Sequence, residues 1–289
     1  MKFRSYNVIR AVFFVALNLL PLKMNVAGNS FLFLFDLFPS KEEAVFLCGK
    51  NQADGVVYLE KRGKNYGYSL LNSDGSKTKF CGNATMCVAK YLFDSGFERA
   101  REFTIATDSG IKKVTVFGKR ECKKVRLEVG KPHFQRLFPY SGNSFLLRLT
   151  YKGKRYGMRA FPVWIGNDHL VVFKNRNNGL ADETISELVN SSGLFPDGVN
   201  LELVHVKKNV LETTVFERGC GKTTACGSGA AAVAFAAKEC GYTEDSVVVR
   251  FDGGDILTEI KKGRVYITGN PKYCKPQDEK KNEENGICE

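Results

Sequence analysis

Several features that define common protein classes are missing from this 289-residue chain. It has no Gly-rich phosphate loop and no lysine that the sequence marks as a pyridoxal site. Its apolar stretch from Ala11 to Leu22 is too short for a comfortable membrane span. The formal net charge is +12, but the lysines are spread along the chain and form no compact basic block interleaved with aromatic residues. We therefore expect a globular protein with neither a membrane nor a nucleic acid as its partner.

The cysteines do not form the pattern of a disulfide scaffold or a zinc site. There are nine, an odd number for a chain of this length. Five residues separate Cys81 from Cys87 and Cys220 from Cys226, whereas structural zinc sites usually use spacings of about two to four. We expect no metal and a reducing compartment, which favours the cytoplasm.

The N-terminal segment MKFRSYNVIRAVFFVALNLLPL has two interpretations. Basic residues followed by a short apolar run resemble a signal peptide. No clear small-residue cleavage site follows Pro21, however, and a cut near Ala27 would enter an expected first strand. A start codon read too far upstream, with Met24 as the true start, is the favoured interpretation. Under either interpretation, we expect residues 1–23 to be an extra N-terminal segment.

One unit of sequence occurs twice in the chain. Residues 81–96 read CGNATMCVAKYLFDSG, and residues 226–241 read CGSGAAAVAFAAKECG. Both open on Cys-Gly, continue through an apolar helical pattern, and reach a glycine that suits a helix C-cap. The segments at 107–116 and 251–260, and those at 126–132 and 265–271, also match and indicate strand–turn–strand units.

The duplication predicts an α/β (α+β) fold of two pseudo-symmetric domains. Each domain is expected to be a mixed sheet wrapped around a central helix, with the active site in the cleft between them. The first is expected to cover residues 24–132 plus 272–289, and the second residues 133–271. The polar, charged end of the chain, KPQDEKKNEENGICE, is expected to be disordered.

The two repeated motifs each put a cysteine at the start of a helix. A helix N-terminus favours anions, and a thiol there is expected to have a lowered pKa. A single such cysteine is more often a structural one, but two facing each other could remove and deliver a proton on opposite faces of a carbon. The charge that develops on an adjacent carboxylate would be stabilised by the backbone N–H groups of Gly82, Asn83, Gly227 and Ser228.

From about Lys23 to about Lys272 the chain resembles the diaminopimelate epimerase family of pyridoxal-independent amino-acid racemases. The matching segments are NVAGNSFLFLFD, LNSDGSKTKFCGNATMC, IGNDHLVVF, DGVNLELV and FERGCGKTTACGSGA. The resemblance implies Cys81 and Cys226 as the two catalytic thiols, with His169 and Glu217 assisting them. It implies substrate contacts from Asn29, Asn72, Gly82, Asn83, Asn167, Asn200, Arg218, Gly227 and Ser228.

The activity implied by this resemblance is a cofactor-independent isomerase reaction at the α-carbon of an amino acid. The favoured substrate is L,L-diaminopimelate, giving meso-diaminopimelate for lysine and peptidoglycan precursor synthesis. Arg218 and the asparagines suit a substrate with a second amino-acid end, such as diaminopimelate or lanthionine. A homodimer is one expected assembly.

Four departures from the family pattern leave the substrate open. Ala84-Thr85-Met86 stands where the family usually has Gly-Ala-Arg, a variant that resembles the histidine racemases on the same fold. Gly55 replaces a glutamine, Lys222 a glutamate, and Asp168 the proline of Gly-Asn-Pro-His. Histidine racemase is therefore one alternative, and a non-catalytic or binding paralogue is another. Both thiols are kept, which counts against the second.

Overall fold

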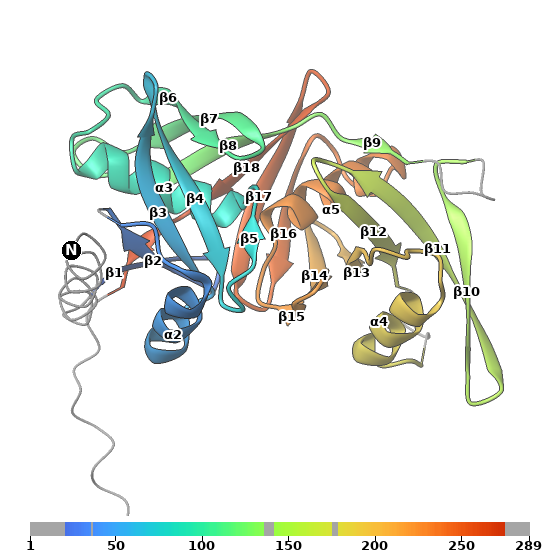
Figure 1. Cartoon of the computed structure of the whole chain (residues 1–289). Coiled ribbons are helices and arrows are strands. Elements are labelled where there is room, and N and C mark those ends of the chain that lie inside the picture. Colours follow the sequence, from blue (N-terminus) through green and yellow to red (C-terminus); the bar gives the residue numbers. More distant parts are fainter. Residues whose placement is uncertain (1–20, 36, 136–141, 175–178, 275–289) are drawn as a thin grey trace, which may run out of the picture.

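The computed structural model describes residues 21–35, 37–135, 142–174 and 179–274 (Figure 1). The predicted extra segment lies outside these residues up to position 20, and so does the predicted disordered end from position 275. The first strand begins at Leu22, and within it the Lys23 Nζ donates hydrogen bonds to the carbonyls of Asn51 and Gln52, at 2.6 and 3.0 Å. Within the described ranges, no helix is both long and apolar enough to cross a lipid bilayer.

The chain order of the elements repeats. The first run comprises β1 (Leu22–Val26), β2 (Asn29–Leu34), α2 (Lys41–Asn51), β3 (Gly55–Arg62), β4 (Asn65–Asn72), β5 (Lys77–Thr78), α3 (Gly82–Asp94), β6 (Glu102–Thr107), β7 (Gly110–Phe117) and β8 (Lys124–Gly130). The second comprises β9 (His133–Phe134), β10 (Phe145–Tyr151), β11 (Lys154–Trp164), β12 (Asp168–Phe173), α4 (Asp182–Ser191), β13 (Asn200–Lys207), β14 (Val210–Glu217), β15 (Gly221–Thr223), α5 (Gly227–Glu239), β16 (Ser246–Phe251), β17 (Gly254–Lys261), β18 (Arg264–Gly269) and β19 (Lys272–Tyr273).

Strand pairing repeats in the same way. In the first half, β2 and β3 are parallel and connected through α2, and β4 and β6 are parallel and connected through α3. In the second half, β12 with β13 and β14 with β16 repeat these parallel pairs, connected through α4 and α5. The remaining pairs are antiparallel in both halves. The predicted mixed α/β fold with two copies of one unit is confirmed.

The helices α3 and α5 begin and end as the repeated motif predicts. Cys81 and Cys226 are their N-cap residues, with extended φ/ψ of −136°/121° and −132°/119°. Gly96 and Gly241 follow the last turn at φ +73° and +71°, a left-handed conformation that suits glycine.

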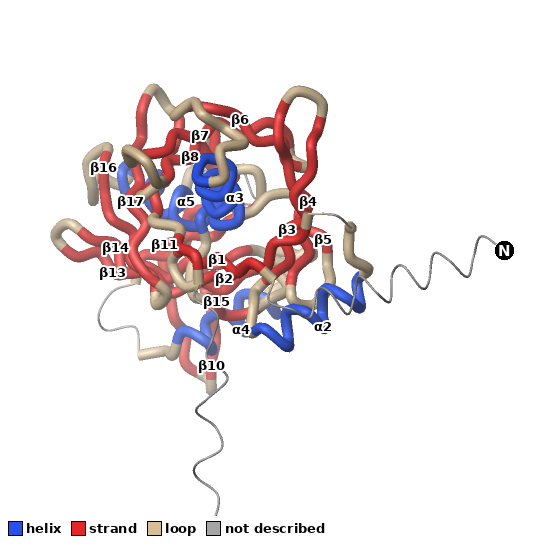
Figure 2. Tube along the Cα trace, turned by 90° about the vertical axis from the view of Figure 1, so that its left-hand side faces the viewer, coloured by secondary structure: helices blue, strands red, loops and turns tan. Residues whose placement is uncertain are grey.

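The central position of α3 and α5 is also confirmed. Figure 2 shows the two helices close together, surrounded by strands. Each of the six alanines of α5 is at most 2% exposed, so their small size lets the sheets approach the helix closely. One hydrophobic cluster continues from the residues around α3 to those around α5, and the two halves therefore share a core.

Two smaller cores lie under the other helices. Ala44, Leu47 and Cys48 of α2 pack on β2 and β3, and Ile185 and Val189 of α4 pack on the sheet of the second half. The start of α2 is fixed by a capping box, in which the Ser40 and Glu43 side chains bond to each other's backbone N–H.

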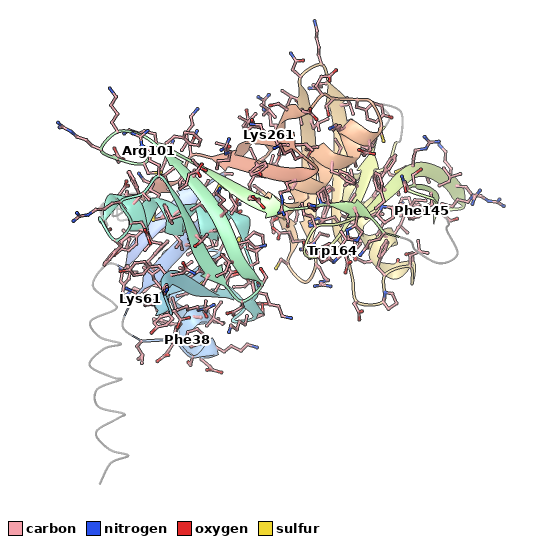
Figure 3. All side chains as sticks on the ribbon, turned by 90° about the horizontal axis from the view of Figure 1, so that it is seen from above. Phe38, Lys61, Arg101, Phe145, Trp164 and Lys261 are labelled. Carbon is pink, nitrogen blue, oxygen red and sulfur yellow. The ribbon has the colours of Figure 1, made fainter. Side chains whose placement is uncertain are left out.

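Two strand pairs link the halves. The strands β8 and β18 are antiparallel neighbours, and β19 returns to pair with β1. Figure 3 shows Phe38, Lys61 and Arg101 on one lobe and Phe145 and Trp164 on the other. The division into domains at residues 132 and 271 stays a prediction.

Candidate active site

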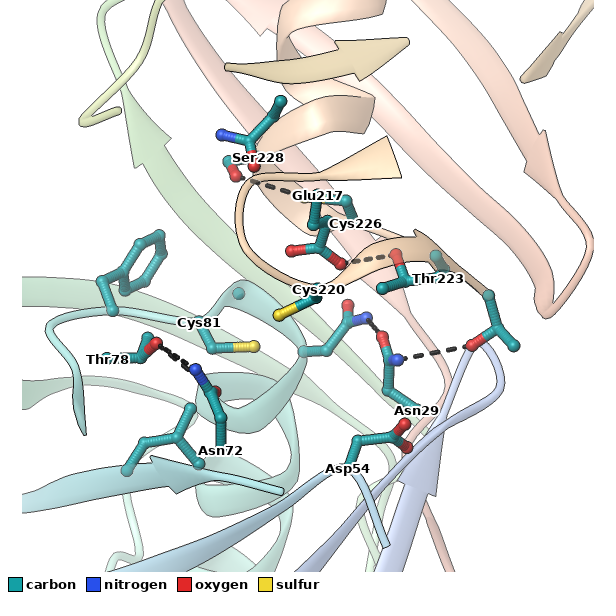
Figure 4. Close-up of a pocket in the computed structure, with 18 of the residues that line it drawn as sticks. Asn29, Asp54, Asn72, Thr78, Cys81, Glu217, Cys220, Thr223, Cys226 and Ser228 are labelled. Atoms are coloured by element: carbon teal, nitrogen blue, oxygen red, sulfur yellow. Dashed lines mark hydrogen bonds between the residues drawn. The ribbon is translucent and has the colours of Figure 1, made fainter. Parts of the chain in front are cut away.

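A cavity of about 420 Å³ lies where the two halves meet. It is lined by the ends of strands and by the first residues of α3 and α5 (Figure 4). Of the predicted site residues, the structure brings into its lining Asn29, Asn72, Cys81, Gly82, Asn83, Asn167, Asn200, Glu217, Arg218, Cys226, Gly227 and Ser228. His169 is the exception, because its side chain is fully buried behind this surface.

The N-termini of α3 and α5 almost touch inside the cavity. A Cβ atom added to Gly227 would lie 3.4 Å from the Cα of Gly82 and 3.0 Å from the Cδ1 of Ile267. Glycine at both positions therefore permits the close approach. Two helix N-termini at one point combine their unpaired N–H groups and their partial positive charge, which makes this end of the cavity suited to a carboxylate.

Cys81 is held through its backbone by Tyr68. The Tyr68 hydroxyl lies 3.1 Å from the Cys81 carbonyl oxygen and 3.4 Å from its amide nitrogen, and 2.7 Å from the Thr85 hydroxyl. Burial raises the pKa of the Cys81 thiol to about 12, and the amides of Ala84 and Asn83 oppose this rise only in part. The expectation of a lowered thiol pKa is wrong here, because desolvation outweighs the helix terminus.

Cys226 has a different set of neighbours. Its Sγ accepts a hydrogen bond from the Gly229 amide at 3.3 Å and lies 3.4 Å from the Ser228 Oγ. Burial raises the pKa of this thiol well above its ordinary value, and the charges of Glu217 and Glu202 add to the effect. Cys226 is 6% exposed, and Cys81 is half-buried.

Glu217 is the carboxylate that faces the thiols. Its Oε1 accepts a hydrogen bond from the Thr223 Oγ1 at 2.6 Å (Figure 4). Burial raises the pKa of Glu217, against the opposing effects of the nearby Thr223, His169 and Cys226 side chains. A carboxylate with a raised pKa is a stronger base than an ordinary one, which makes Glu217 better suited to accept a proton than an exposed glutamate.

Three amide side chains line the half of the cavity that contains Cys81. The Asn83 Nδ2 donates to the Asn29 Oδ1, and the Asn29 Nδ2 lies 3.3 Å from the Thr224 Oγ1. The Asn72 Nδ2 donates to the Thr78 Oγ1 at 3.0 Å. These contacts fix the orientation of each amide before any ligand enters.

On the other side, Asn200 joins two segments that carry charge. Its Oδ1 accepts from the Arg218 backbone N–H at 3.0 Å, and its Nδ2 donates to the Asp168 carbonyl at 2.8 Å. The Arg218 Nη1 then lies 4.0 Å from the Asp168 Oδ2, and both side chains are almost half exposed. The Gln135 Nε2 donates to the other oxygen of Asp168 at 2.6 Å.

The departures from the family pattern fall partly outside the cavity. Ala84, Thr85 and Met86 are completely buried in α3 and do not line it. Lys222 does line it, and its Nζ lies 3.3 Å from Asp252 Oδ2 and 3.8 Å from Glu183 Oε1.

Sequence reasoning missed Glu202, Asp54 and Tyr68. Glu202 is fully buried and its Oε1 lies 2.6 Å from the Nδ1 of His169. A lone acidic residue in the apolar strand sequence NLELV was the signal, since a buried charge needs a partner. Asp54 lines the cavity and accepts the Ser30 N–H at 2.7 Å. Tyr68 gave no signal, because an aromatic residue in a strand is ordinary.

The described cysteines are all free, and Cys220 is the exposed one at the edge of the cavity. No group of three or more His, Cys, Asp or Glu side chains in the described ranges is arranged to hold a metal ion.

The fold and the cavity define a duplicated α/β protein in which two cysteine-capped helix N-termini meet in one cavity. The family model for diaminopimelate epimerase matches residues 41–135 and 161–274. The chain belongs to the diaminopimelate epimerase family, whose members are amino-acid epimerases and racemases that work without pyridoxal phosphate.

Curated relatives cover most of the chain. A diaminopimelate epimerase from Parabacteroides distasonis is 30% identical, over 86% of this chain and 93% of its own length. One from Desulfitobacterium hafniense is 33% identical, over 87% and 94%. A solved structure of a probable proline racemase from Agrobacterium radiobacter K84 shares the fold, with a TM-score of 0.64, 16% identity, and coverage of 87% and 89%.

Proposed function

We propose that this protein is a two-thiol epimerase that converts L,L-diaminopimelate to the meso isomer without a cofactor. The observation that carries the proposal is the pair of cysteine-capped helix N-termini meeting in one cavity. Removing a proton next to a carboxylate puts negative charge on that carboxylate, and the two helix N-termini are positioned to stabilise it.

In the proposed reaction, one cysteine starts as thiolate and the other as thiol. The thiolate takes the α-proton, and the electron pair left on the α-carbon is delocalised into the carboxylate. The other thiol then gives its proton to the opposite face of the carbon. Each turnover leaves the two cysteines with exchanged protonation states, and the reverse reaction restores them.

Glu217 is proposed to prepare the thiolate. Burial keeps both thiol pKa values high, so ionisation in the cavity needs a base. Glu217 lines the same cavity as Cys226 and has a raised pKa of its own. It is therefore suited to accept the thiol proton of Cys226 and return it.

The far end of the cavity supports a substrate with a second amino-acid group. Arg218 can bind a carboxylate, and the amides of Asn72 and Asn200 can take part in binding the distal end. Under this proposal the product serves lysine and peptidoglycan precursor synthesis in the cytoplasm. A homodimer remains part of the proposal.

One observation favours a second candidate, histidine racemisation. Asp168 lies 4.0 Å from Arg218, so the arginine has a partial counter-charge without any substrate carboxylate. A substrate with a neutral distal end therefore need not leave a guanidinium without a partner.

The test is α-proton exchange followed by proton NMR in heavy water. Reduced protein is given L,L-diaminopimelate or L-histidine in separate tubes, and the Cys81→Ala/Cys226→Ala double variant is the control. We expect the α-proton signal of diaminopimelate to disappear only with the unsubstituted protein. Exchange with histidine alone would move the assignment to the second candidate, and silence with both substrates from a folded protein would contradict both.

A further inference from the structure

The buried pair formed by His169 and Glu202 belongs to only one half of the duplicated fold. In β12 and β13, His169 pairs with Asn200, and Glu202 lies two residues further along β13. In the matching strands β2 and β3, Phe31 pairs with Gly55, so Phe31 and Val57 occupy the corresponding places. The fold therefore accepts two apolar side chains where the second half has a carboxyl and an imidazole.

Burying a charged or titratable pair has a desolvation cost that an apolar pair does not have. Both His169 and Glu202 have side chains with no exposed area. Glu202 also lies close to the first turn of α5, beside the Cys226 thiol. A Cβ atom added to Gly229 in that turn would lie 2.7 Å from the Glu202 Oε1 and 3.4 Å from the Cys226 Sγ. Such a costly pair next to the cavity indicates a role beyond packing.

The contacts of the imidazole ring identify what the pair holds. The His169 Nε2 lies 2.9 Å from the Oδ1 of Asn167, a carbonyl oxygen that can only accept, so Nε2 carries a proton. The Nδ1 lies 2.6 Å from the Glu202 Oε1, and one proton sits between them. With Nε2 protonated, either a neutral Glu202 carboxyl donates to Nδ1 or an imidazolium donates to the carboxylate, and in both cases Glu202 holds the ring in this orientation.

Asn167 is the residue at the end of this chain of contacts, and it lines the cavity. Its counterpart in the first half is Asn29, whose Oδ1 is instead held by the Asn83 side chain. The counterpart of Asn83 at the start of α5 is Ser228, which is shorter and lies beside the Cys226 thiol. The second half therefore needs another donor for its asparagine, and His169 is that donor.

We propose that Glu202 is a positioning residue that acts through His169 to hold the Asn167 amide, so that its Nδ2 is the donor offered to the substrate. This inference rests on the proposed function, since it takes an amino acid bound in the cavity as the recipient of that donor. It also accounts for both ring nitrogens of His169 being engaged within the protein.

The main variant replaces the pair by the residues of the first half, as His169→Phe/Glu202→Val. This variant leaves no buried charge and keeps side chains that the same fold already packs, and it removes the donor to the Asn167 Oδ1, which is the contact under test. We expect its melting temperature to stay close to that of the unsubstituted protein. Its KM for diaminopimelate should rise by about tenfold or more, the effect of one lost hydrogen bond, with a smaller change in kcat.

Glu202→Gln is the conservative variant. A glutamine amide can donate to the Nδ1 and keep the proton on Nε2, so we expect its KM to stay within about threefold of the starting value. Thr258→Val is the matched control, because it removes a buried hydroxyl that bonds to the Val247 carbonyl away from the cavity. It should leave KM unchanged.

A second readout does not depend on turnover. The chain has three histidines, so nitrogen-15 NMR of histidine-labelled protein can follow the ring of His169 directly. A protonated Nε2 is expected in the unsubstituted protein and in Glu202→Gln, and mixed tautomers in Glu202→Val.

An unchanged KM in the double variant would overturn the inference, as would a collapse of kcat at constant KM, which would place His169 in the chemistry itself. A mixed tautomer in the unsubstituted protein would also overturn it. Failure of every amino acid to react would refute the proposed function, while the NMR spectrum would still test the chain from Glu202 to Asn167.

Discussion

Replacing Glu217 by glutamine separates two effects that the structure assigns to this carboxylate. Its negative charge raises the pKa of both Cys81 and Cys226, after the larger effect of burial. Its place in the cavity lining together with Cys226 also makes it the base proposed to accept the thiol proton. Glu217→Gln removes the charge and the base but keeps an oxygen that can accept from Thr223.

Loss of the charge should speed alkylation of Cys81, whereas loss of the base should slow epimerisation. With a pKa of about 12, the Cys81 thiol at pH 8 is ionised in about one molecule in ten thousand. Removing a nearby like charge should raise that fraction by roughly tenfold, and alkylation of Cys81 should accelerate by the same factor. Loss of the base should slow epimerisation by about 10² to 10⁴.

The assay is alkylation by iodoacetamide, followed by mass spectrometry, beside the heavy-water NMR assay. Cys240, at the far end of α5, is the internal reference because Glu217 does not perturb its pKa. Faster alkylation with slower epimerisation supports the reasoning. Unchanged alkylation of Cys81 would mean that Glu217 does not act on the thiols, and undiminished epimerisation would mean that it is not the base.

Three further changes test other parts of the account. Asp168→Asn removes the weak counter-charge of Arg218, so KM for diaminopimelate should fall by about two- to fivefold while that for histidine stays constant; equal changes would contradict this. Gly28 has a φ of +84°, which strains any residue with a side chain, and the Cβ of Gly28→Ala would lie 2.7 Å from the Cα of Gly253. The substitution should therefore lower the free energy of unfolding by about 1–3 kcal/mol, measured by urea titration. Burial raises the pKa of Cys87, so the unfolded chain ionises first and stability should fall as pH rises above about 8.5. Cys87→Ala should reduce that slope by up to about 1.4 kcal/mol per pH unit, and an unchanged slope would exclude the thiol as its cause.

The parts of the fold that were predicted from the sequence are those encoded by the repeated unit. Two cysteines, each followed by an apolar helix and a glycine, marked the start and end of α3 and α5 correctly. The alanine content of α5 predicted its depth, because small side chains are useful in a helix that sheets surround. If the two repeated units face each other, residues from both halves must meet in one cavity. The structure brings twelve of the thirteen named site residues into the lining of that cavity.

Properties that depend on the surroundings of a residue could not be predicted. The helix position of Cys81 suggested a lowered pKa, but the depth of the site is a tertiary property, and burial reverses the sign. Glu202 was passed over because its partner His169 lies on a neighbouring strand more than thirty residues away in the chain. Asp168 was noted only as a departure, since its distance to Arg218 depends on how β12 meets the end of β14.

The most direct test of the two-thiol account compares Cys81→Ala and Cys226→Ala, each given L,L- or meso-diaminopimelate in heavy water. The account predicts that neither variant inverts the α-carbon, because one thiol cannot serve both faces. Any remaining α-proton exchange should come from one face in the first variant and from the opposite face in the second. Interconversion of the two isomers by either single variant at a rate near that of the unsubstituted protein would contradict the account.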